Sequence, residues 1–191
     1  MELIFASQNQ NKLNEIQSKL SSNIKLIGLK DLNYNEELPE TAKTIIENAL
    51  QKARFVYEKF GKDCFADDTG LEIESLNNLP GVDTAHYAGP ERNANLNMDK
   101  VLREMQNANS RNARFVTIFA LILNGKEYLF EGEVKGIIAT EKRGNQGFGY
   151  DPIFIPENHQ NTFAEMDLNQ KNSMSHRARA LSKMLDFLNK D

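Results

Sequence analysis

The 191-residue sequence predicts an α/β protein with a mixed, twisted central sheet flanked by helices. Short apolar segments alternate with helical patterns in its first half, which favours strand–helix–strand units. Its second half carries two long β-branched and aromatic segments, 114–123 and 127–139, joined through Asn124-Gly125. Such a joint is typical of an antiparallel hairpin, so we expect parallel and antiparallel pairing in one sheet.

The chain begins with a strand, a loop and a helix. The apolar residues of 3–6 predict a buried strand, and the polar loop 7–12 follows it. From position 13 to 20, apolar residues recur at helical spacing. A second strand is expected over 24–29.

A second helix is expected from about position 41 to 60. Thr41 or Thr44 could cap its start, and Gly61 ends it.

The middle of the chain predicts short strands near 64–66 and 71–74, on either side of Asp67-Asp68-Thr69-Gly70. A loop punctuated by glycine and proline covers 79–90, and a helix carries the apolar residues of 96–105.

The last part of the chain begins with a glycine-rich loop, 144–151, and a short strand, 153–155. A final helix starts at about Ser175, with its apolar residues on one face. No linker interrupts the pattern, so we expect one domain, 1–191, with two lobes around a substrate cleft.

Composition excludes several classes of protein. The net charge of −4 disfavours a surface that coats nucleic acid, which needs clustered Lys and Arg. The single cysteine, Cys64, excludes an internal disulfide, and three scattered histidines lack zinc-ligand spacing. Cys64 fits a buried strand position, since a catalytic thiolate would need a neighbouring base.

The N-terminal segment predicts a cytoplasmic protein. It has no basic region and its apolar run is too short for a signal peptide. The longest clean apolar run, 118–123, is far shorter than a membrane span.

Two adjacent carboxylates, Asp67 and Asp68, stand where the sequence predicts a strand to break into a glycine turn. Successive strand side chains point to opposite faces, so both can face one cleft only if the strand has ended. The run is also ordinary turn chemistry, because Asp and Thr bond nearby backbone and Gly tolerates positive φ. The long loop that follows, 79–90, favours a functional interpretation.

The loop 7–12 joins a strand end to a helix start, where free backbone N–H groups and the helix dipole attract anions. Lys12 adds a full charge. Asn9 or Asn11 could instead cap the helix, and the two roles are compatible.

Two later segments could contact a nucleotide. Gly147-Phe148-Gly149-Tyr150-Asp151-Pro152 presents aromatic rings between glycines, which suits either a planar ligand such as a nucleobase or a tight turn with core-packing rings. Lys171 and Ser175-His176-Arg177 bring cationic donors to the last helix start, unless they form a solvated basic face.

Acidic residues near the second helix are candidate partners for Asp68 in a metal site, since Mg²⁺ binds a few hard oxygens together with water and phosphate. Glu36, Glu37, Glu40 and Glu47 are the candidates, and Glu40 is favoured because it lies close to the helix start.

In their order and spacing, segments from the first strand to the last helix resemble the inosine triphosphate pyrophosphatase family, which acts on non-standard purine nucleoside triphosphates. The segments are Ser7-Gln8-Asn9-Gln10-Asn11-Lys12, Glu47-Asn48-Ala49 with Lys52-Ala53, Ala66-Asp67-Asp68-Thr69-Gly70-Leu71, Leu79-Pro80-Gly81-Val82, Gly147-Phe148-Gly149-Tyr150-Asp151-Pro152, Phe163-Ala164-Glu165-Met166 before Lys171, and Ser175-His176-Arg177.

The resemblance implies hydrolysis of ITP, dITP and XTP to the monophosphate and pyrophosphate with Mg²⁺, usually by a homodimer. It implies Asp68 as the general base and a metal ligand. The matching positions imply substrate contacts from Ser7, Gln8, Asn9, Gln10, Asn11, Lys12, Lys52, Thr69, Phe148, Gly149, Tyr150, Asp151, Lys171, His176 and Arg177.

Several positions depart from the commoner family pattern. Ser7 and Thr69 keep a hydroxyl donor. Asp83, Thr84 and His86 stand where Tyr, Ser and Arg are usual, and histidine lacks the permanent charge and bidentate fork of arginine.

The expected mechanism assigns a proton acceptor and several cations. An ordinary Asp has a pKa near 3.9, so Asp68 should act on water whose acidity Mg²⁺ has raised. Lys12, Lys171 and Lys52 would neutralise phosphate oxygens. Arg177 or a backbone N–H aimed at the 6-oxo group would favour ITP over ATP.

Three other functions compete with this hypothesis. A pyrophosphatase of similar fold could act on pyrimidine or modified nucleotides. A non-catalytic nucleotide-binding module would keep the loops without needing Asp68. An RNA- or DNA-binding protein is disfavoured by the acidic charge balance.

Overall fold

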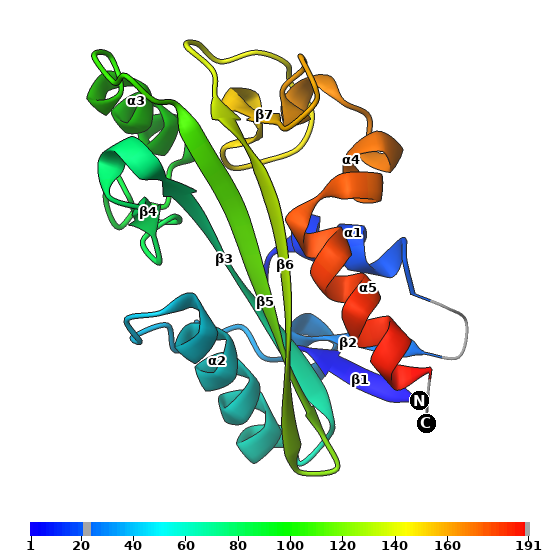
Figure 1. Cartoon of the computed structure of the whole chain (residues 1–191). Helices are drawn as coiled ribbons and strands as arrows, with labels where there is room; N and C mark the ends of the chain where they lie inside the picture. The colour runs from blue at the N-terminus through cyan, green and yellow to red at the C-terminus, as the bar shows by residue number, and fades with distance from the viewer. Residues whose placement is uncertain (21–23, 190–191) are drawn as a thin grey trace. The chain divides into compact units, whose positions relative to one another are not determined.

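The computed structural model describes residues 1–20 and 24–189 and confirms an α/β fold with a mixed sheet (Figure 1). The order of the seven-stranded sheet is β2-β1-β3-β5-β6-β7, with β4 paired to β3. The strands are β1 Glu2–Phe5, β2 Lys25–Gly28, β3 Cys64–Ile73, β4 Leu79–Gly81, β5 Asn112–Leu123, β6 Lys126–Ile138 and β7 Phe154–Pro156. The helices are α1 Gln10–Gln17, α2 Ile45–Phe60, α3 Ala94–Glu104, α4 Leu168–Met174 and α5 His176–Leu188.

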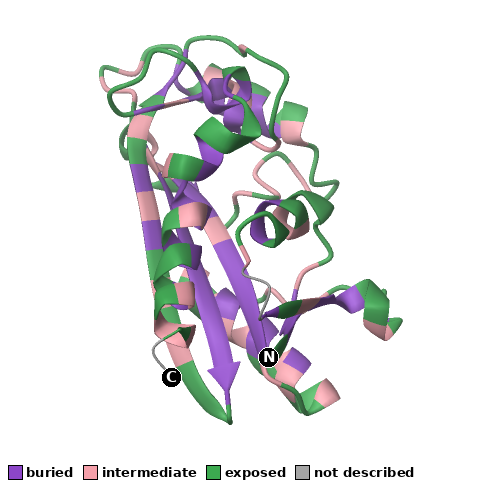
Figure 2. Ribbon diagram, turned by 90° about the vertical axis from the view of Figure 1, so that its right-hand side faces the viewer, coloured by how far each residue is buried: buried purple, intermediate pink, exposed green. Residues whose placement is uncertain are grey.

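The chain forms two compact units. Unit 1 comprises Met1–Asp68, Thr117–Gly132 and Arg177–Asp191, and unit 2 comprises Thr69–Val116 and Glu133–His176. Strands β3, β5 and β6 each contribute one segment to unit 1 and one to unit 2. In both units, buried residues lie along the strands (Figure 2).

Unit 1 carries helices on both faces of its sheet segment. Strand β1 pairs in parallel with β2 and β3, as the alternation of strands and helices predicts. On one face, α1 and α5 pack through Ile16 and Leu181 against a core that includes Phe5, Phe65 and Phe119. The rings of Phe5 and Phe65 stack with centroids 4.9 Å apart.

Helix α2 lies on the other side of these strands from α5 (Figure 1). Its Ala49, Ala53 and Val56 are fully buried. The Cys64 thiol donates to the Ala53 carbonyl at 3.2 Å, which confirms Cys64 as a buried strand residue. Burial raises the pKa of this thiol to about 12, so it is not a thiolate at neutral pH.

Both ends of α2 follow from local side-chain chemistry. Thr44 is the N-cap, and its Oγ1 accepts a hydrogen bond from the Glu47 N–H at 3.1 Å. Thr41, the alternative cap, instead bonds the side chain of Gln51. Gly61 ends the helix with φ of 61°, a conformation that favours glycine.

Unit 2 builds its core on one face of its sheet segment. Leu71 and Ile73 of β3 pack there with Val101 and Met105 of the α3 segment. Residues that alternate with this core, such as Glu72, point to the opposite face. Strand β4 pairs antiparallel with β3, and β7 pairs antiparallel with β6.

The hairpin predicted through Asn124-Gly125 is confirmed. It joins β5 to β6, and both residues have positive φ, 51° and 75°. Two positive φ values match a turn whose twist fits that of the flanking strands. The Asn124 N–H also donates to Asp63 Oδ1 at 2.8 Å.

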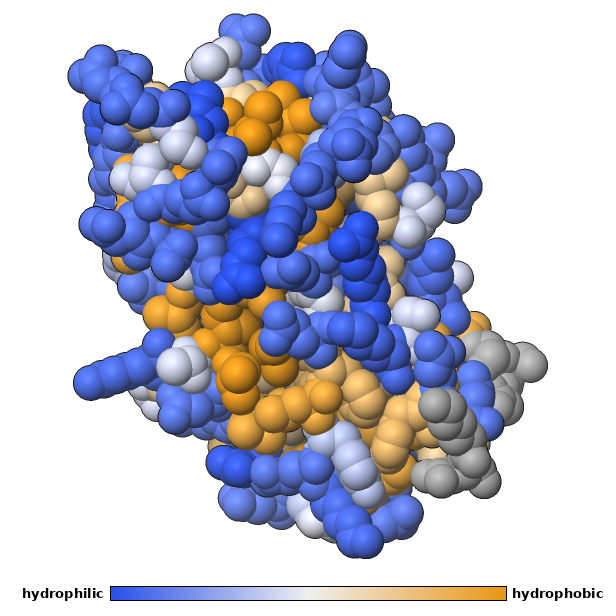
Figure 3. Space-filling view, viewed as in Figure 1, coloured by the Kyte–Doolittle hydropathy of each residue, from blue (hydrophilic) through white to orange (hydrophobic). Residues whose placement is uncertain are grey.

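The surface is mainly hydrophilic, with apolar patches, on the face that Figure 3 shows. Among the helices of the described residues, we find none with the length and apolar character needed to cross a membrane.

Candidate active site

The loop between β1 and α1 is organised by its own hydrogen bonds. Asn9 caps α1, and its Oδ1 accepts from the N–H groups of Asn11 at 3.0 Å and Lys12 at 3.3 Å. The Asn9 N–H donates to Ser7 Oγ at 3.2 Å. The predicted cap is confirmed. Its hydrogen bonds engage backbone N–H groups that the sequence suggested for binding an anion. The anion site expected at this loop would therefore rely chiefly on the Lys12 charge.

The two glutamines of this loop are exposed and bond within unit 1. Gln8 Nε2 donates to the Glu36 carbonyl at 2.5 Å, and Gln10 Nε2 donates to Asn14 Oδ1 at 3.1 Å.

Strand β3 runs without interruption through the acid pair, so the predicted break into a turn, with separate strands over 64–66 and 71–74, is wrong. The reason is tertiary: β3 is hydrogen-bonded to β1 and β5 in the sheet as well as to β4, and these pairings override the local turn propensity of the sequence. Because the strand continues, Asp67 and Asp68 project to opposite faces.

Asp67 faces the side of the sheet that α1 and α5 cover. Its Oδ1 accepts from Lys12 Nζ at 2.9 Å, and its Oδ2 accepts from Arg177 Nε at 3.2 Å. The side chain of Asp67 is fully buried. Although burial opposes ionisation, Lys12 and Arg177 hold the pKa of Asp67 well below its usual range. Asp67 is therefore a permanent anion, unsuited to exchanging protons near neutral pH.

Asp68 meets a different set of charges on the opposite face. Lys52 Nζ of α2 donates to Asp68 Oδ1 at 2.9 Å and to Glu40 Oε1 at 2.5 Å. Burial raises the pKa of Asp68, outweighing the attraction of Lys52. The pKa of Lys52 is also raised, because Asp68 and Glu40 outweigh the effect of its burial. Of the two aspartates, Asp68 is the one whose environment suits a base.

Glu40 is the glutamate that the structure brings to Asp68. Glu47 instead accepts from the Thr44 hydroxyl at 2.9 Å at the start of α2, and the Glu37 carbonyl accepts from Tyr34. Within residues 1–20 and 24–189 no group of three or more His, Cys, Asp or Glu could hold a metal. Two carboxylates converging on one ammonium nevertheless fit Mg²⁺, which is commonly bound by one or two carboxylates plus phosphate and water.

Glu15 joins Arg177, Asp67 and Lys12 on the other face of β3 and was not predicted from the sequence. Arg177 NH1 donates to Glu15 Oε2 at 2.5 Å, and both side chains are buried. The sequence held a signal: Glu15 lies one helical turn after Lys12 and beside the core residue Ile16. A carboxylate at the buried edge of a helix requires a charged partner.

In unit 2, Asp151 organises the aromatic loop. Its Oδ2 accepts from Lys171 Nζ at 2.8 Å and from the Phe148 N–H at 2.8 Å. The Lys171 ammonium lies 4.6 Å from the centre of the Phe148 ring. The Phe148 ring is half-buried, while Tyr150 is buried and its hydroxyl donates to the Thr84 carbonyl at 2.8 Å.

Glycine is required at Gly147 by the approach of Asp151. A Cβ there would lie 2.1 Å from Asp151 Oδ2, and its φ is 72°. Gly149 has φ of 65° with open space around it, so only its backbone conformation favours glycine. The glycines thus allow both the tight turn and the presentation of a ring.

The remaining predicted residues take distinct positions. The His176 ring stacks on Phe115 of β5 with centroids 4.7 Å apart and is buried. Arg177 is also buried, so these neighbours do not form a solvated basic face. Thr69 is half-buried within β3.

The positions that depart from the family pattern serve the loop after β4. Thr84 Oγ1 accepts from the Leu71 N–H at 2.8 Å and donates to the Gly81 carbonyl at 2.6 Å. His86 Nε2 accepts from Arg92 Nε at 2.9 Å.

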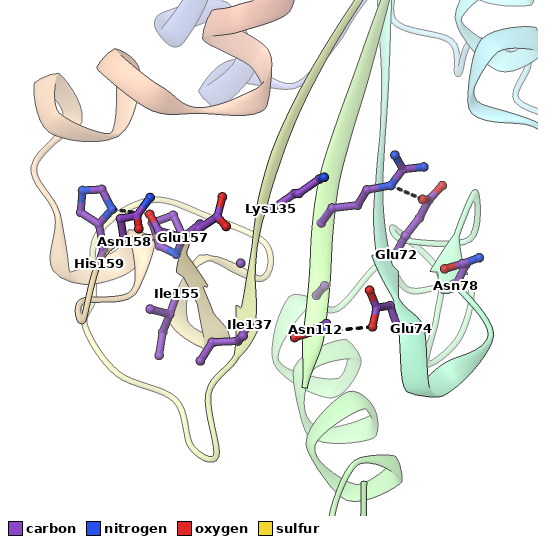
Figure 4. Close-up of a pocket in the computed structure, with 14 residues that line it drawn as sticks. Glu72, Glu74, Asn78, Asn112, Lys135, Ile137, Ile155, Glu157, Asn158 and His159 are labelled. Carbon is purple, nitrogen blue, oxygen red and sulfur yellow. Dashed lines mark hydrogen bonds and ion pairs between the residues drawn. The ribbon is translucent and has the colours of Figure 1, made fainter. Parts of the chain in front are cut away.

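A pocket of about 630 Å³ in unit 2 contains none of the predicted residues (Figure 4). Its charged side chains largely satisfy one another: Arg114 pairs with Glu72 at 2.7 Å, and Asn112 donates to Glu74 at 3.0 Å. The pocket is therefore a weaker candidate for the active site than the residues described above.

The charged and aromatic side chains described above thus form two clusters. Unit 1 contains the charged cluster, which we define as Lys12, Glu15, Glu40, Lys52, Asp67, Asp68 and Arg177, and unit 2 contains the aromatic cluster, Phe148, Asp151, Lys171 and His176.

Comparison with known proteins places this arrangement in a family. The model of the Ham1 family matches residues 3–187. This chain belongs to the Ham1 family. A Ham1 relative from Flavobacterium psychrophilum named dITP/XTP pyrophosphatase is 54% identical over 187 residues, covering 98% of each chain. Another of that name, from Porphyromonas gingivalis, is 48% identical over 98% of this chain and 97% of its own.

Solved Ham1 structures share the fold. A HAM1 protein from Coxiella burnetii is 38% identical and superposes with a TM-score of 0.92, covering all of both chains. The Staphylococcus aureus Ham1 protein is 34% identical with a TM-score of 0.91, covering 100% of this chain and 99% of its own. The family resemblance predicted from the sequence is confirmed.

Proposed function

We propose that this Ham1 protein hydrolyses ITP, dITP and XTP to the monophosphate and pyrophosphate with Mg²⁺, and so removes non-standard purine nucleotides from the cytoplasmic pool. Relatives that match over 98–100% of the chain and are named dITP/XTP pyrophosphatase support a nucleotide pyrophosphatase, and hence a hydrolase. The observation that carries the mechanism is the convergence of Asp68 and Glu40 on Lys52.

Asp68 is the proposed general base. The raised pKa of Asp68 makes its carboxylate a stronger proton acceptor, which suits it to take a proton from the attacking water. Burial also limits the hydration of this carboxylate. Lys52 holds Asp68 Oδ1 at 2.9 Å, and Oδ2 is the oxygen that would accept the proton from water. The nucleophilic water then attacks the α phosphorus, and the bond to the bridging oxygen of pyrophosphate breaks.

Asp68 and Glu40 are the residues that would hold Mg²⁺. When bound, the ion supplies Lewis acidity, which makes water more acidic and neutralises charge on phosphate oxygens. Lys12 and Lys52 would add positive charge for the phosphates, and the buried position of Lys52 strengthens its electrostatic effect.

Base recognition is proposed for the aromatic cluster. The Phe148 ring offers a stacking surface, and the Lys171 ammonium above it offers a hydrogen-bond donor. A 6-oxo purine presents an acceptor to such a donor, whereas adenine presents an amino group. Arg177, the donor suggested by the sequence, pairs with Asp67 and Glu15 in unit 1, whereas Lys171, which pairs with Asp151, lies beside the Phe148 ring. We assign the 6-oxo contact to Lys171 because of this proximity to the stacking surface.

Pyrophosphate release from a panel of nucleoside triphosphates tests this function. With Mg²⁺ present, ITP, dITP and XTP should give kcat/KM values at least about 100-fold above that for ATP, since unpaired buried donors penalise the wrong base. The products should be a monophosphate and pyrophosphate, resolved by ³¹P NMR. Release of orthophosphate, or equal turnover of ATP, would contradict the proposal.

The same panel separates the alternatives. Preferred hydrolysis of dTTP or UTP would indicate a pyrophosphatase for pyrimidine nucleotides. Binding of ITP without pyrophosphate release would indicate a nucleotide-binding module. Tight, salt-sensitive duplex binding would favour the nucleic-acid hypothesis.

A further inference from the structure

Four side chains of unit 1, three of them buried and Lys12 partly exposed, form a row of alternating charge. Glu15 Oε2 accepts from Arg177 NH1 at 2.5 Å, Arg177 Nε donates to Asp67 Oδ2 at 3.2 Å, and Lys12 Nζ donates to Asp67 Oδ1 at 2.9 Å. The row connects α1, β3 and α5. Lys12 and Glu15, at the two ends of the row, both belong to α1 and lie one helical turn apart.

Exposure changes along this row. Asp67 is 0% exposed and Arg177 4%, Glu15 is 7%, and Lys12 is 16%, the most exposed of the four. Buried charges of this kind depend on their partners for stability and geometry. Each of the two oxygens of Asp67 holds a different cation, so the position of one cation affects the other.

We propose that Glu15 is a positioning residue for phosphate binding: by holding Arg177 it keeps Asp67 directed toward Lys12, and thereby fixes the ammonium that receives the substrate phosphates. This inference rests on the proposed function of Lys12. Glu15 itself acts through Arg177 and Asp67 and has no contact with substrate in this scheme.

The electrostatics explain why Glu15 matters. Without its charge, Arg177 would depend more heavily on Asp67, and guanidinium groups favour bidentate pairing with a carboxylate. Asp67 would then shift toward Arg177 and release Lys12. Asp68 lies on the opposite face of β3 with Lys52 and Glu40, so the chemical step should change less than binding does.

The first test is kinetic. Glu15→Gln should raise the KM for dITP about tenfold or more while kcat stays within about threefold, the pattern of lost binding that is equal in ground and transition states. Glu127→Gln is the matched control, because it also removes one carboxylate charge from an ion pair of unit 1. Glu127 is exposed and pairs with Arg54 at 2.6 Å.

A double-mutant cycle shows whether Glu15 acts through Lys12. Calorimetry measures the affinity of the wild type, Glu15→Gln, Lys12→Met and the double variant for tripolyphosphate. We expect about tenfold weaker binding in Glu15→Gln, and no further loss when the same change is made in the Lys12→Met background. Simple destabilisation of the fold would instead give losses that multiply.

Multiplying losses, or wild-type binding by Glu15→Gln, would overturn the inference. If Glu15→Gln does not fold, Glu15→Asp replaces it in the cycle, since a shorter side chain also withdraws the carboxylate from Arg177, and the same coupling is expected. Failure of the proposed function can be told apart from failure of this inference. In the first case the wild type would not release pyrophosphate from dITP, while the tripolyphosphate cycle would still measure coupling between Glu15 and Lys12.

Discussion

Asp67 and Asp68 have the same side chain and adjacent positions, yet their surroundings give them opposite acid–base behaviour. Two cations lower the pKa of Asp67, whereas burial raises that of Asp68. The difference follows from strand geometry, which sends one carboxylate toward Lys12 and Arg177 and the other toward Lys52. One residue stabilises a charged cluster, and the other is suited to chemistry.

The role of Asp67 predicts a loss of stability that depends on pH. Asp67→Asn should lower the free energy of unfolding at pH 7 by about 3–5 kcal/mol, because Lys12 and Arg177 lose a buried partner. The folded-state pKa of Asp67 lies below the unfolded value near 3.9, so its stabilising contribution is complete above that value. It is lost as the pH falls through the folded-state pKa.

Urea unfolding of the wild type and Asp67→Asn between pH 3 and 7 measures this effect. The difference in stability between the two proteins should be constant above about pH 4 and should begin to narrow below it, by at most about 1.4 kcal/mol per pH unit. A constant difference across this range would contradict the assignment of Asp67 as a permanent anion.

Lys171 should control the choice of base. Lys171→Met is expected to reduce the ratio of kcat/KM for ITP over ATP about tenfold or more, since a charge-assisted hydrogen bond is worth about 1.5–3 kcal/mol. Lys135→Met, the same change at an exposed position of unit 2, should leave the ratio unchanged. The assignment fails if both variants retain the wild-type preference.

Sequence reasoning at the residue scale found side chains but few of their partners. Glu40 was a candidate because it lies close to a helix start, and Asp68 because it is one of two adjacent acids before a glycine. Lys52 was implied by the family resemblance. Their convergence could not be deduced, since it depends on how α2 packs beside β3. Glu15 was missed for the same reason: its partner Arg177 is distant in sequence and comes from α5.

At the scale of elements, helix α3 holds the loop that follows β4. Asn97 is buried, its Oδ1 accepts from the Ala88 N–H at 2.7 Å, and its Nδ2 donates to the Ala85 carbonyl at 3.0 Å. Lys100 Nζ also donates to the Tyr87 carbonyl at 2.8 Å. The loop is therefore ordered by side chains of one helix face.

Asn97→Ala should destabilise the protein by about 2–3 kcal/mol, because it leaves two backbone groups of the loop without their partner. Asn95→Ala is the control on the same helix, since Asn95 is exposed, and its effect should stay within about 0.5 kcal/mol. Hydrogen exchange should show faster exchange at Ala88 in Asn97→Ala alone. Equal unfolding midpoints in urea would contradict this role.

Elements defined by local chemistry were predicted well, and those defined by tertiary pairing were not. The hairpin at Asn124-Gly125 and the end of α2 at Gly61 follow from backbone conformations that these residues favour. The turn expected at Asp67-Asp68-Thr69-Gly70 is strand instead, because β3 is hydrogen-bonded between β1 and β5 in the sheet.

At the scale of the whole molecule, we expect a homodimer, as the family resemblance implies. Light scattering after size-exclusion chromatography should give twice the chain mass of 21.7 kDa. A mass of 21.7 kDa at tens of micromolar protein would show a monomer.

The most direct test of the proposed chemistry is pyrophosphate release from dITP by Asp68→Asn. Because burial already disfavours the charge of Asp68, the neutral variant should fold, as thermal unfolding can verify. We predict that kcat falls about 100-fold or more, with tripolyphosphate still bound. A folded Asp68→Asn protein that releases pyrophosphate at the wild-type rate would contradict Asp68 as the base.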